Sequence, residues 1–463
     1  MVFPTVEFAI FFPIVLALSW ALMSRPRIWK PFMLGASYVF YSAANPKFCI
    51  MLAGITLGNQ GAAKLIHRSA DERLRKALMI AAVAATLLTL GVFKYYGFFA
   101  TEFNAALDKL GLGLPLPLAA IALPVGISFI VFQAISYTVD VWRRTIEPAK
   151  TIDVALYLSF FSHLVAGPIV RAREFLPQLA TPRDPRNVAV GAAVFLIVVG
   201  LIKKVGVADT LAREIVDPVF TVPQDFSAPD VILASYAFAV QIFCDFSGYT
   251  DIAIGTALLV GFVFPQNFDS PYRATSFREF WRRWHMTLSR FLRDFLYIPL
   301  GGNRGGKWKT ARNLMITMLL GGLWHGAAWG FVLWGAIHGT ALTVEHFFRG
   351  KLHVPRWLAW FVVFHIVVLA WIPFRAPDLN LAGDFVSRLF VPGPATLWTF
   401  PVVALVVIMI GYQLLPTRPL DALRVRLEAL PPVALGTGLA AVIAIVAATV
   451  SSQGVPPFIY FQF

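Results

Sequence analysis

Long apolar runs recur along nearly the whole of this 463-residue chain, and they restrict what it can fold into. A helix needs about 20 consecutive apolar residues to cross the hydrocarbon core of a bilayer. Because the backbone must satisfy its own hydrogen bonds in lipid, open sheets cannot span it. Charged residues make up 14% of the chain, whereas soluble domains carry about 25%. The sequence therefore predicts an all-α polytopic membrane protein.

The formal net charge of +14 comes from basic loops, so it does not indicate nucleic-acid binding. Lys and Arg gather in loops between apolar runs, which is the pattern that keeps positive loops in the cytoplasm. The first such loop holds Arg25, Arg27 and Lys30, and "HRSADERLRK" and "WRRTIEPAK" form the next two. This pattern predicts that the N-terminus and the C-terminus both lie outside the cytoplasm.

About 11 membrane helices are predicted, within one unit over 1–463 that has no separate soluble domain. Two apolar runs have basic residues on both sides, so neither is a single crossing: 152–170 and 313–348. The first is expected to be re-entrant or interfacial, as non-spanning segments buried in protein are. The second is expected to be a hairpin of two short helices that turns near Gly326–Gly330.

The segment 276–302 predicts one amphipathic helix at the membrane interface, because its large apolar side chains share one arc at 100° per residue. One interpretation is a surface helix whose arginines bind lipid phosphates. His285 lies on the apolar arc and is expected to face the protein, as a packing residue or a functional one. The following "GGNRGGKWK" is a candidate phosphate loop with Arg304 or Lys307, although it lacks the GK[ST] ending of a Walker loop.

His325 is an ionisable side chain inside the apolar stretch "LLGGLWHGAAWG". A polar residue in a membrane segment indicates a function, and an imidazole titrates near neutral pH. A helix-bridging hydrogen bond is the alternative. His163 and His365 are expected to be packing residues, and His338 stays ambiguous between the two. Neighbouring glycines allow close approach of helices; they are Gly321, Gly322, Gly326, Gly330, Gly335 and Gly339.

Three segments resemble the membrane-bound O-acyltransferases, and most of all the bacterial alginate O-acetyltransferase type. They are "CDFSGYTDIAIG" (244–255), "PQNFDSPYRATSFREFWRRWHMTLSRFLRDFLYIPLGGNR" (265–304) and "GGLWHGAAWGFVLWGAIHG" (321–339). The earlier "GVFKYYGFF", "LPVGISFIVFQAISYTVDVWR" and "LVAGPIVR" match in the expected order, with Ser162 where Pro is expected. The resemblance covers about 5–375, and 376–463 is expected to hold additional spans.

The resemblance implies a central tunnel in which a cytoplasmic acyl thioester meets a hydroxyl acceptor. The family's essential histidine maps onto His325, as general base, and its second histidine maps onto His285. No permanently bound cofactor and no metal are expected; acetyl-CoA or another acyl thioester is the expected co-substrate. Substrate- or donor-binding roles are predicted for Trp324, Arg282, Asn303, Arg304, Lys307, Asp245, Tyr249 and Asp251.

The predicted function is O-acyl transfer, with acetyl as the expected group, to an extracytoplasmic polysaccharide such as alginate. The expected location is a bacterial inner membrane, and the expected partner is an extracytoplasmic SGNH-type acetyltransferase. The alternative is a transporter or a scaffold of a polysaccharide export complex without its own chemistry. A transporter of this kind would show internal repeats, and none is visible in the sequence.

Overall fold

The computed structural model describes residues 1, 3–112, 115–117, 122–415 and 419–449. All regular structure in that part of the chain is helical. Within it, five helices are long and apolar enough to cross a membrane, and four shorter apolar helices accompany them. The five are Lys47–Arg68, Glu72–Lys109, Val190–Thr221, Ala228–Leu259 and Arg356–Arg375. The predicted all-α, multi-pass membrane protein is confirmed, and the count of about 11 stays a prediction.

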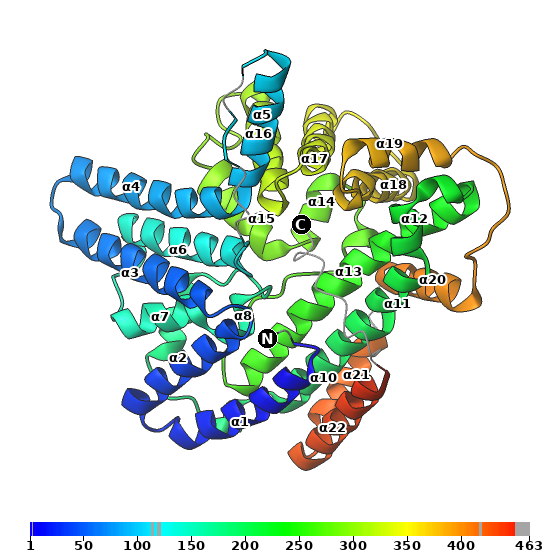
Figure 1. The fold of residues 1–463 in the computed structure, drawn as a ribbon. Coiled ribbons are helices and arrows are strands. Elements are labelled where there is room, and N and C mark those ends of the chain that lie inside the picture. The colour runs from blue at the N-terminus through cyan, green and yellow to red at the C-terminus, as the bar shows by residue number, and fades with distance from the viewer. Residues whose placement is uncertain (2, 113–114, 118–121, 416–418, 450–463) are drawn as a thin grey trace. The chain divides into compact units, whose positions relative to one another are not determined.

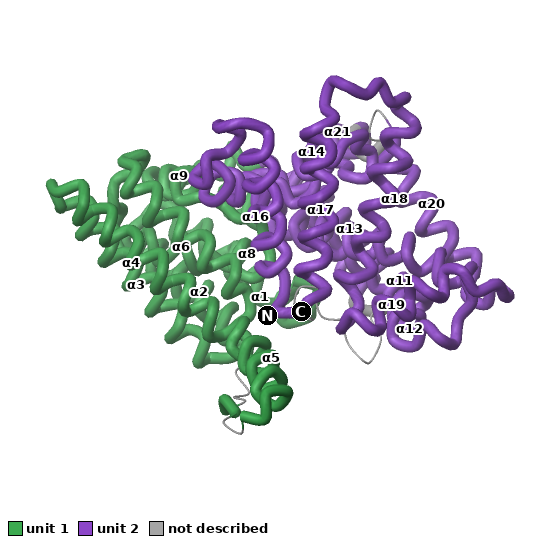
Figure 2. Tube along the Cα trace, turned by 90° about the horizontal axis from the view of Figure 1, so that it is seen from above, with its two compact units in different colours: residues 1–188, 256–264 green, residues 189–255, 265–463 purple. Residues whose placement is uncertain are grey.

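The chain divides into two compact units (Figure 2). Unit 1 comprises residues 1–188 and 256–264, and unit 2 comprises 189–255 and 265–463. The long helix α13 (Ala228–Leu259) gives its last turn to unit 1 and its remainder to unit 2. The predicted functional unit over 1–463, with a family-like core that ends near 375, stays a prediction.

Unit 1 consists of helices that pack side by side (Figure 1). They are α1 (Val6–Leu22), α2 (Pro26–Ser42), α3 (Lys47–Arg68), α4 (Glu72–Leu90), α5 (Tyr96–Lys109), α6 (Ile127–Trp142), α7 (Thr151–Ser159), α8 (Phe161–Leu164) and α9 (Ala172–Phe175). Asn59 on α3 accepts a hydrogen bond from the Thr138 hydroxyl of α6 at 2.8 Å and donates one to Thr86 of α4 at 3.0 Å. Such bonds join helices where water is absent.

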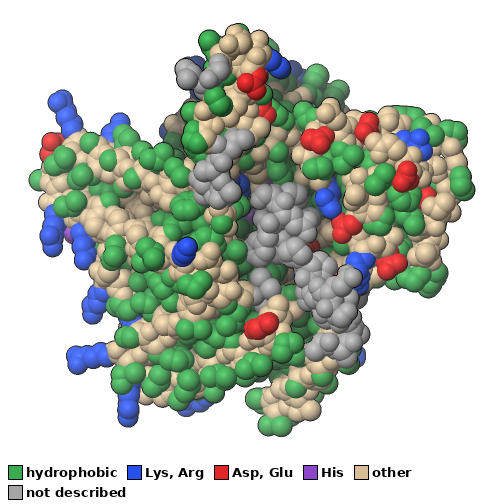
Figure 3. Space-filling model, in the orientation of Figure 1, with side chains coloured by type: hydrophobic (Ala, Val, Ile, Leu, Met, Phe, Trp, Pro, Cys, Tyr) green, Lys and Arg blue, Asp and Glu red, His purple; other side chains and the backbone are tan. Residues whose placement is uncertain are grey.

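The basic loops of unit 1 meet at one end of its helices. Lys30, beside the α1–α2 loop, pairs with Asp153 at the start of α7 (2.6 Å). Glu72, at the start of α4, pairs with Arg144 just after α6 (2.8 Å). Figure 3 shows Lys and Arg side chains around the end of α3 and α4 that carries their connection. This unit thus gathers its positive loops on one side, as the positive-inside rule requires.

The apolar run 152–170 folds as short helices. α7 has 9 residues, which rise only about 14 Å, less than half of the hydrocarbon core. The chain breaks at Phe160, and α8 adds 4 residues. This agrees with the prediction that the run does not cross the membrane. His163 Nε2 lies 2.8 Å from the Tyr157 carbonyl oxygen, as expected of a packing histidine.

Unit 2 holds the other helices and every predicted site residue. They are α10 (Val190–Leu201), α11 (Asp209–Leu211), α12 (Asp217–Thr221), most of α13, α14 (Phe277–Arg283), α15 (Met286–Leu292), α16 (Lys307–His325), α17 (Trp329–Phe348), α18 (Arg356–Arg375), α19 (Leu379–Arg388), α20 (Phe400–Leu414), α21 (Pro419–Glu428) and α22 (Pro432–Thr449). Two π-helical segments, Ile202–Ala208 and Ala212–Val216, interrupt the long helical stretch α10–α12. π-Helical turns are rare and often occur at functional sites.

The run 313–348 lies within a helical hairpin, α16 and α17, that turns at 326–328 as predicted. The expectation of two short helices is wrong, because α16 has 19 residues and α17 has 20. Each is therefore about 30 Å long. The polar segment from Lys307 to Asn313 forms the first turns of α16. Periodicity in the apolar run alone does not reveal this extension of the helix.

Glycine lets the backbones of α16 and α17 touch. A Cβ added at Gly322 would lie 2.2 Å from the Phe331 carbonyl oxygen, and one at Gly335 would lie 2.5 Å from the Met318 carbonyl oxygen. Real Cβ atoms do not approach backbone this closely, so the predicted role of glycine in close helix approach is confirmed at these two positions.

Gly322→Ala is expected to lower the free energy of unfolding by about 1–3 kcal/mol, because the new methyl group forces the hairpin apart. Thermal unfolding of the detergent-purified protein measures this. Gly58→Ala on α3 is the matched control, since a Cβ there meets nothing within 4 Å. Equal melting temperatures of the two variants would contradict the proposed contact.

Candidate functional site

His285 lies at a break between two helices. The single amphipathic helix expected over 276–302 is wrong: α14 ends at Arg283, and α15 begins at Met286. His285 has φ 42° and ψ 55°, the left-handed conformation that non-glycine residues rarely adopt. Its inward orientation is nevertheless as predicted, because the side chain is 0% exposed.

Asn267 holds this break in place. Its Oδ1 accepts hydrogen bonds from the Thr287 backbone N–H (3.1 Å) and the Thr287 hydroxyl (2.9 Å). The same oxygen lies 3.2 Å from His285 Nδ1, and the Asn267 carbonyl accepts from the Met286 N–H (2.9 Å). Because an amide oxygen only accepts, Nδ1 carries the imidazole proton and Nε2 is the acceptor nitrogen. One side chain thus caps α15 and orients the histidine.

The buried His285 ring is neutral at physiological pH. Burial lowers the pKa of His285 to about 3, because desolvation disfavours the imidazolium. The ring packs edge-on against Phe246 of α13, with ring centroids 4.6 Å apart, and lies 6.0 Å from Trp324. A neutral imidazole can orient a substrate by accepting a hydrogen bond, whereas it is not a standing proton donor.

His325 is the last residue of α16, at the tip of the hairpin. It is 3% exposed and lies among Trp324, Trp334 and Phe374, with ring centroids 4.9, 5.0 and 5.2 Å away. The negative end of the helix dipole at this position favours a positive charge. Trp324 is buried between the two predicted catalytic histidines, so the structure brings these three predicted residues together.

The predicted donor-binding loop is exposed and lies on the same unit. Arg282, Asn303, Arg304 and Lys307 are all exposed. The loop has a defined shape, because the Asn313 amide donates a hydrogen bond to the Gly302 carbonyl at 2.9 Å. Gly305 and Gly306 both have φ 95°, which only glycine adopts without strain.

Further arginines make this surface more basic than the sequence prediction recognised. The pKa of Arg278 is lowered, first by desolvation and then by the charges of Arg282 and Arg349. Glu345 of α17 accepts hydrogen bonds from the Phe277 and Arg278 backbone N–H groups at 2.7 and 3.2 Å and so fixes the start of α14. Arg349 follows α17 in sequence, so only the fold brings it near Arg278.

Asp245, Tyr249 and Asp251 lie on α13, away from the exposed basic loop in sequence. Asp245 pairs with Lys204 at 2.6 Å, and Asp251 pairs with Lys203 at 2.7 Å. Buried charges in a membrane segment are stable when paired in this way. Both carboxylates therefore join α13 to the π-helical segment, and a donor-binding role for the three residues stays a prediction.

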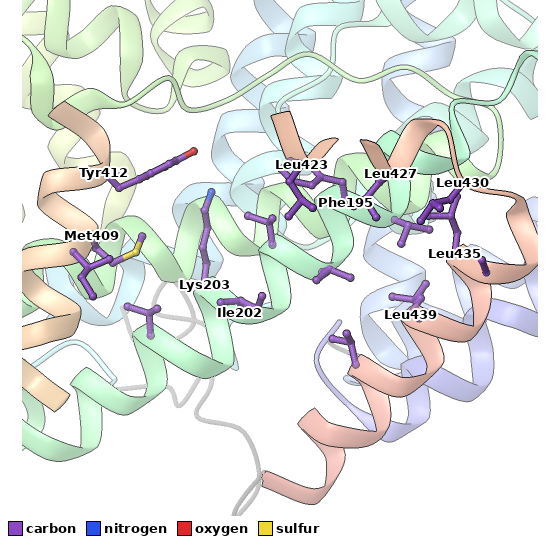
Figure 4. Close-up of a pocket in the computed structure, with 18 residues that line it drawn as sticks. Phe195, Ile202, Lys203, Met409, Tyr412, Leu423, Leu427, Leu430, Leu435 and Leu439 are labelled. Carbon is purple, nitrogen blue, oxygen red and sulfur yellow. The ribbon is translucent and has the colours of Figure 1, made fainter. Parts of the chain in front are cut away.

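An apolar cavity of about 540 Å³ lies among α10, α20, α21 and α22 (Figure 4). Its wall is almost wholly aliphatic, with Lys203 and Tyr412 at one side. It contains neither His285 nor His325. Because the wall is almost wholly aliphatic and neither predicted catalytic histidine lies on it, the cavity is not the candidate active site.

His285 and His325 both lie in the part of the chain that a protein-family model matches. Residues 119–370 match the model of the membrane-bound O-acyltransferase family. The chain is 40% identical over 398 residues to "Probable alginate O-acetylase AlgI" of Azotobacter vinelandii, a match that covers 84% of this chain and 77% of that protein. It is 37% identical over 391 residues to the peptidoglycan O-acetyltransferase of Helicobacter pylori, covering 77% and 72%.

A less similar relative is named for the transfer of a different acyl group. The chain is 28% identical over 233 residues to the teichoic acid D-alanyltransferase of Streptococcus thermophilus, a match that covers 48% of this chain and 56% of that protein. The chain therefore belongs to the membrane-bound O-acyltransferase family and is a multi-pass membrane acyltransferase. The resemblance that the three sequence segments indicated is confirmed.

Asn267→Ala is expected to reduce acyl transfer, because His285 loses the acceptor that orients it. The variant also removes the acceptor of two hydrogen bonds from Thr287, which costs about 1–3 kcal/mol of stability. Asn59→Ala on α3 is the matched control, since Asn59 is equally buried and hydrogen-bonded. Thermal unfolding and acyl turnover are measured for both variants. If both lose stability and Asn267→Ala keeps the turnover of Asn59→Ala, Asn267 has no role in the site.

Proposed function

We propose that this acyltransferase moves an acetyl group from a cytoplasmic thioester to hydroxyls of an extracytoplasmic polysaccharide. The names of relatives at 40% and 37% identity, an alginate O-acetylase and a peptidoglycan O-acetyltransferase, support acetyl as the group and a polysaccharide as the acceptor. Alginate is one such acceptor. The donor is acetyl-CoA or another acyl thioester, used as a co-substrate.

The observation that carries the proposal is the position of His325, a buried imidazole at the tip of a membrane hairpin. His325 takes the proton of the acceptor hydroxyl, whose oxygen attacks the thioester carbonyl. The carbon–sulfur bond breaks, an ester forms, and the proton passes to the leaving thiolate. A positioned base contributes about 10²- to 10⁴-fold in rate. The aromatic wall around His325 excludes water, which limits hydrolysis of the thioester.

His285 and the basic surface serve the donor in this proposal. The neutral His285 ring accepts a hydrogen bond and so positions the donor. Arg282, Arg304 and Lys307 bind its phosphates, since an exposed basic surface attracts anionic ligands. A central tunnel joins this surface to His325, and Trp324 and Asn303 contribute to its walls or its mouth.

The direction of transfer follows from the charge pattern. Basic loops face the cytoplasm, which supports an N-terminus outside, and the relatives from Azotobacter vinelandii and Helicobacter pylori support a bacterial inner membrane as the location. The C-terminus is placed outside as well, although residues 450–463 lie outside the described residues. An extracytoplasmic SGNH-type acetyltransferase receives the acyl group and passes it to the polymer. A transporter or a scaffold without chemistry would instead show no acyl turnover.

His325→Gln is expected to reduce acetyl transfer roughly 10²-fold or more, because glutamine keeps hydrogen bonding but cannot accept the proton. Radiolabelled acetyl-CoA turnover by the purified protein measures this. His365→Gln on α18 is the control, since the His365 ring bonds its own helix at the Phe361 carbonyl. Near-normal transfer by His325→Gln would make His325 structural and the mechanism wrong.

Replacing both Arg304 and Lys307 with Gln is expected to raise the KM for acetyl-CoA several-fold, with a smaller effect on kcat, because ground-state donor binding is lost. The effect should weaken at high salt, which screens exposed charges. Arg68 and Arg73, exposed in the α3–α4 region of unit 1, provide a control pair. An unchanged KM would mean that the glycine-rich loop does not bind the donor and that its charges only favour the cytoplasmic side of the membrane.

A further inference from the structure

The apolar cavity of Figure 4 is formed mostly by helices that follow the family-matched region. Its wall comes from α10 with the π-helical segment that continues it, and from α20, α21 and α22. The last three helices lie beyond residue 370, where the match to the family model ends. The cavity volume is about 540 Å³, and binding sites for small molecules span about 300–1,000 Å³. The proposed acyl transfer makes no use of this space.

Backbone contacts keep the walls of the cavity apart. A Cβ added at Gly200 would lie 2.6 Å from the Gly248 carbonyl oxygen, so α10 rests directly on α13. A Cβ added at Gly191 would lie 2.6 Å from Glu428 Cα, so the end of α21 rests on the start of α10. Protein interiors are otherwise close-packed, and an unfilled cavity lowers stability in proportion to its volume. A space that fixed helices leave open therefore calls for an occupant.

The wall and its surroundings select a hydrocarbon as that occupant. The side chains on the wall are almost wholly aliphatic, and apolar cavities stay free of water. The stretch Val190–Thr221, which contains α10, is long and apolar enough to cross a membrane, and α20 and α22 are shorter apolar helices. The medium next to these helices is therefore lipid, whose acyl chains are the apolar groups available to fill the space.

The volume of the cavity fits a lipid chain better than a further helix. A helix is about 10–12 Å across, so three turns of it occupy on the order of 1,000–2,000 Å³. A hydrocarbon chain is roughly 5 Å thick, and it spans about 15 Å in one leaflet, so it occupies on the order of 300–400 Å³. The cavity of about 540 Å³ accommodates such a chain and is too small for the helix.

The helix α21 provides a place for the polar end of the lipid. Leu423, Leu427 and Leu430 line the cavity (Figure 4), and their spacing puts them on one face of this helix. Arg424 and Arg426 border that face at 100° per residue, and both are exposed. Such an amphipathic helix lies at the membrane interface, where arginines attract the phosphates of lipids.

The pairing of charges on α21 distinguishes its two arginines. Arg424 pairs with Glu428 on the next turn at 2.9 Å. Arg426 lies on the other border of the leucine face, away from this pair. Arg426 is therefore the better candidate for binding a phosphate, and a lipid held there can extend its chain past the leucines into the cavity.

The far side of the cavity disfavours a free fatty acid. Lys203 lies there with Tyr412 (Figure 4), and its ammonium pairs with Asp251 of α13 at 2.7 Å. The charge of Lys203 is thus already compensated. A carboxylate next to this pair would be repelled by Asp251, and a charge within the membrane is costly. This side suits the uncharged end of a chain.

We propose that the cavity binds an acyl chain of a membrane phospholipid, whose phosphate lies at Arg426. The chain fills the space between α10 and the helices α20–α22 and so joins the C-terminal helices to the rest of unit 2. The inference is independent of the proposed function, since the cavity contains neither His285 nor His325.

Gly438 and Gly436 provide a matched pair of positions on α22 for the test. A Cβ at either glycine meets nothing within 4 Å, and Gly438 lines the cavity whereas Gly436 does not. Gly438→Phe therefore places its ring in the space of the chain. Native mass spectrometry of the full-length protein, after extensive washing in detergent, measures the phospholipid that stays bound. Wild type and Gly436→Phe are expected to retain equal amounts, and Gly438→Phe severalfold less.

Thermal unfolding of the delipidated protein adds a second measurement. Phosphatidylglycerol in mixed micelles is expected to raise the melting temperature of wild type and Gly436→Phe, because a ligand that binds the folded state stabilises it. Gly438→Phe is expected to melt at the wild-type temperature or above it without lipid, since its ring fills part of the cavity, and to gain little from the lipid. Arg426→Gln should reduce the gain, whereas Arg73→Gln on α4 should keep it.

Palmitate, which has a chain but no phosphate, separates the phospholipid from a fatty acid as the occupant. A gain from palmitate equal to that from phosphatidylglycerol, or an undiminished gain in Arg426→Gln, overturns the phospholipid assignment. Ala434→Phe, at a second position on the wall, keeps the test valid if Gly438→Phe does not fold. The cavity is no lipid site if these two variants retain as much phospholipid as Gly436→Phe, or if the washed wild type retains none.

Discussion

The backbone contact between α16 and α17 is the constraint on which the candidate site depends. Because Gly322 and Gly335 have no Cβ, the two helices meet carbonyl against Cα, and the hairpin that results places His325 at its tip. The same closeness brings Trp334 of α17 against His325, while Phe374 of α18 closes the other side. The His325 imidazole thus lies at the end of a helix and among aromatic rings.

A second constraint acts at the other histidine, where the chain leaves helical geometry. The strained backbone of His285 would expose polar groups inside the protein if nothing bonded them. Asn267 supplies those bonds with one side-chain oxygen and one carbonyl. The hydrogen bonds of Asn267 thus hold the left-handed backbone of His285 and orient its ring. Burial of the ring lowers its pKa and so favours the neutral imidazole. The two histidines thus differ in setting: His325 ends a helix, and His285 lies at a break between two helices.

Periodicity and charge predicted the helical class, the hairpin turn near Gly326 and the inward face of His285, because each depends on residues close together in sequence. The same reasoning failed at the break after Arg283, since a 100° arc cannot reveal that Asn267, far upstream, interrupts the helix. It also missed Arg349 beside Arg278 and the partners of Asp245 and Asp251, all of which depend on contacts between separate helices. His338 was ambiguous in the sequence, because a histidine in an apolar run looks the same whether or not its nitrogens are bonded. Only the fold shows that neither ring nitrogen of His338 has a hydrogen-bond partner among the described residues.

The hairpin contact has a consequence for how enzymes of this type can diverge. A Cβ at Gly322 or Gly335 would meet the backbone of the facing helix, so a larger residue there would move the two helices apart. A change of Trp334 leaves that backbone contact in place. Under the proposed function, the position of the base and the range of substrates would therefore depend on different atoms of the same two helices.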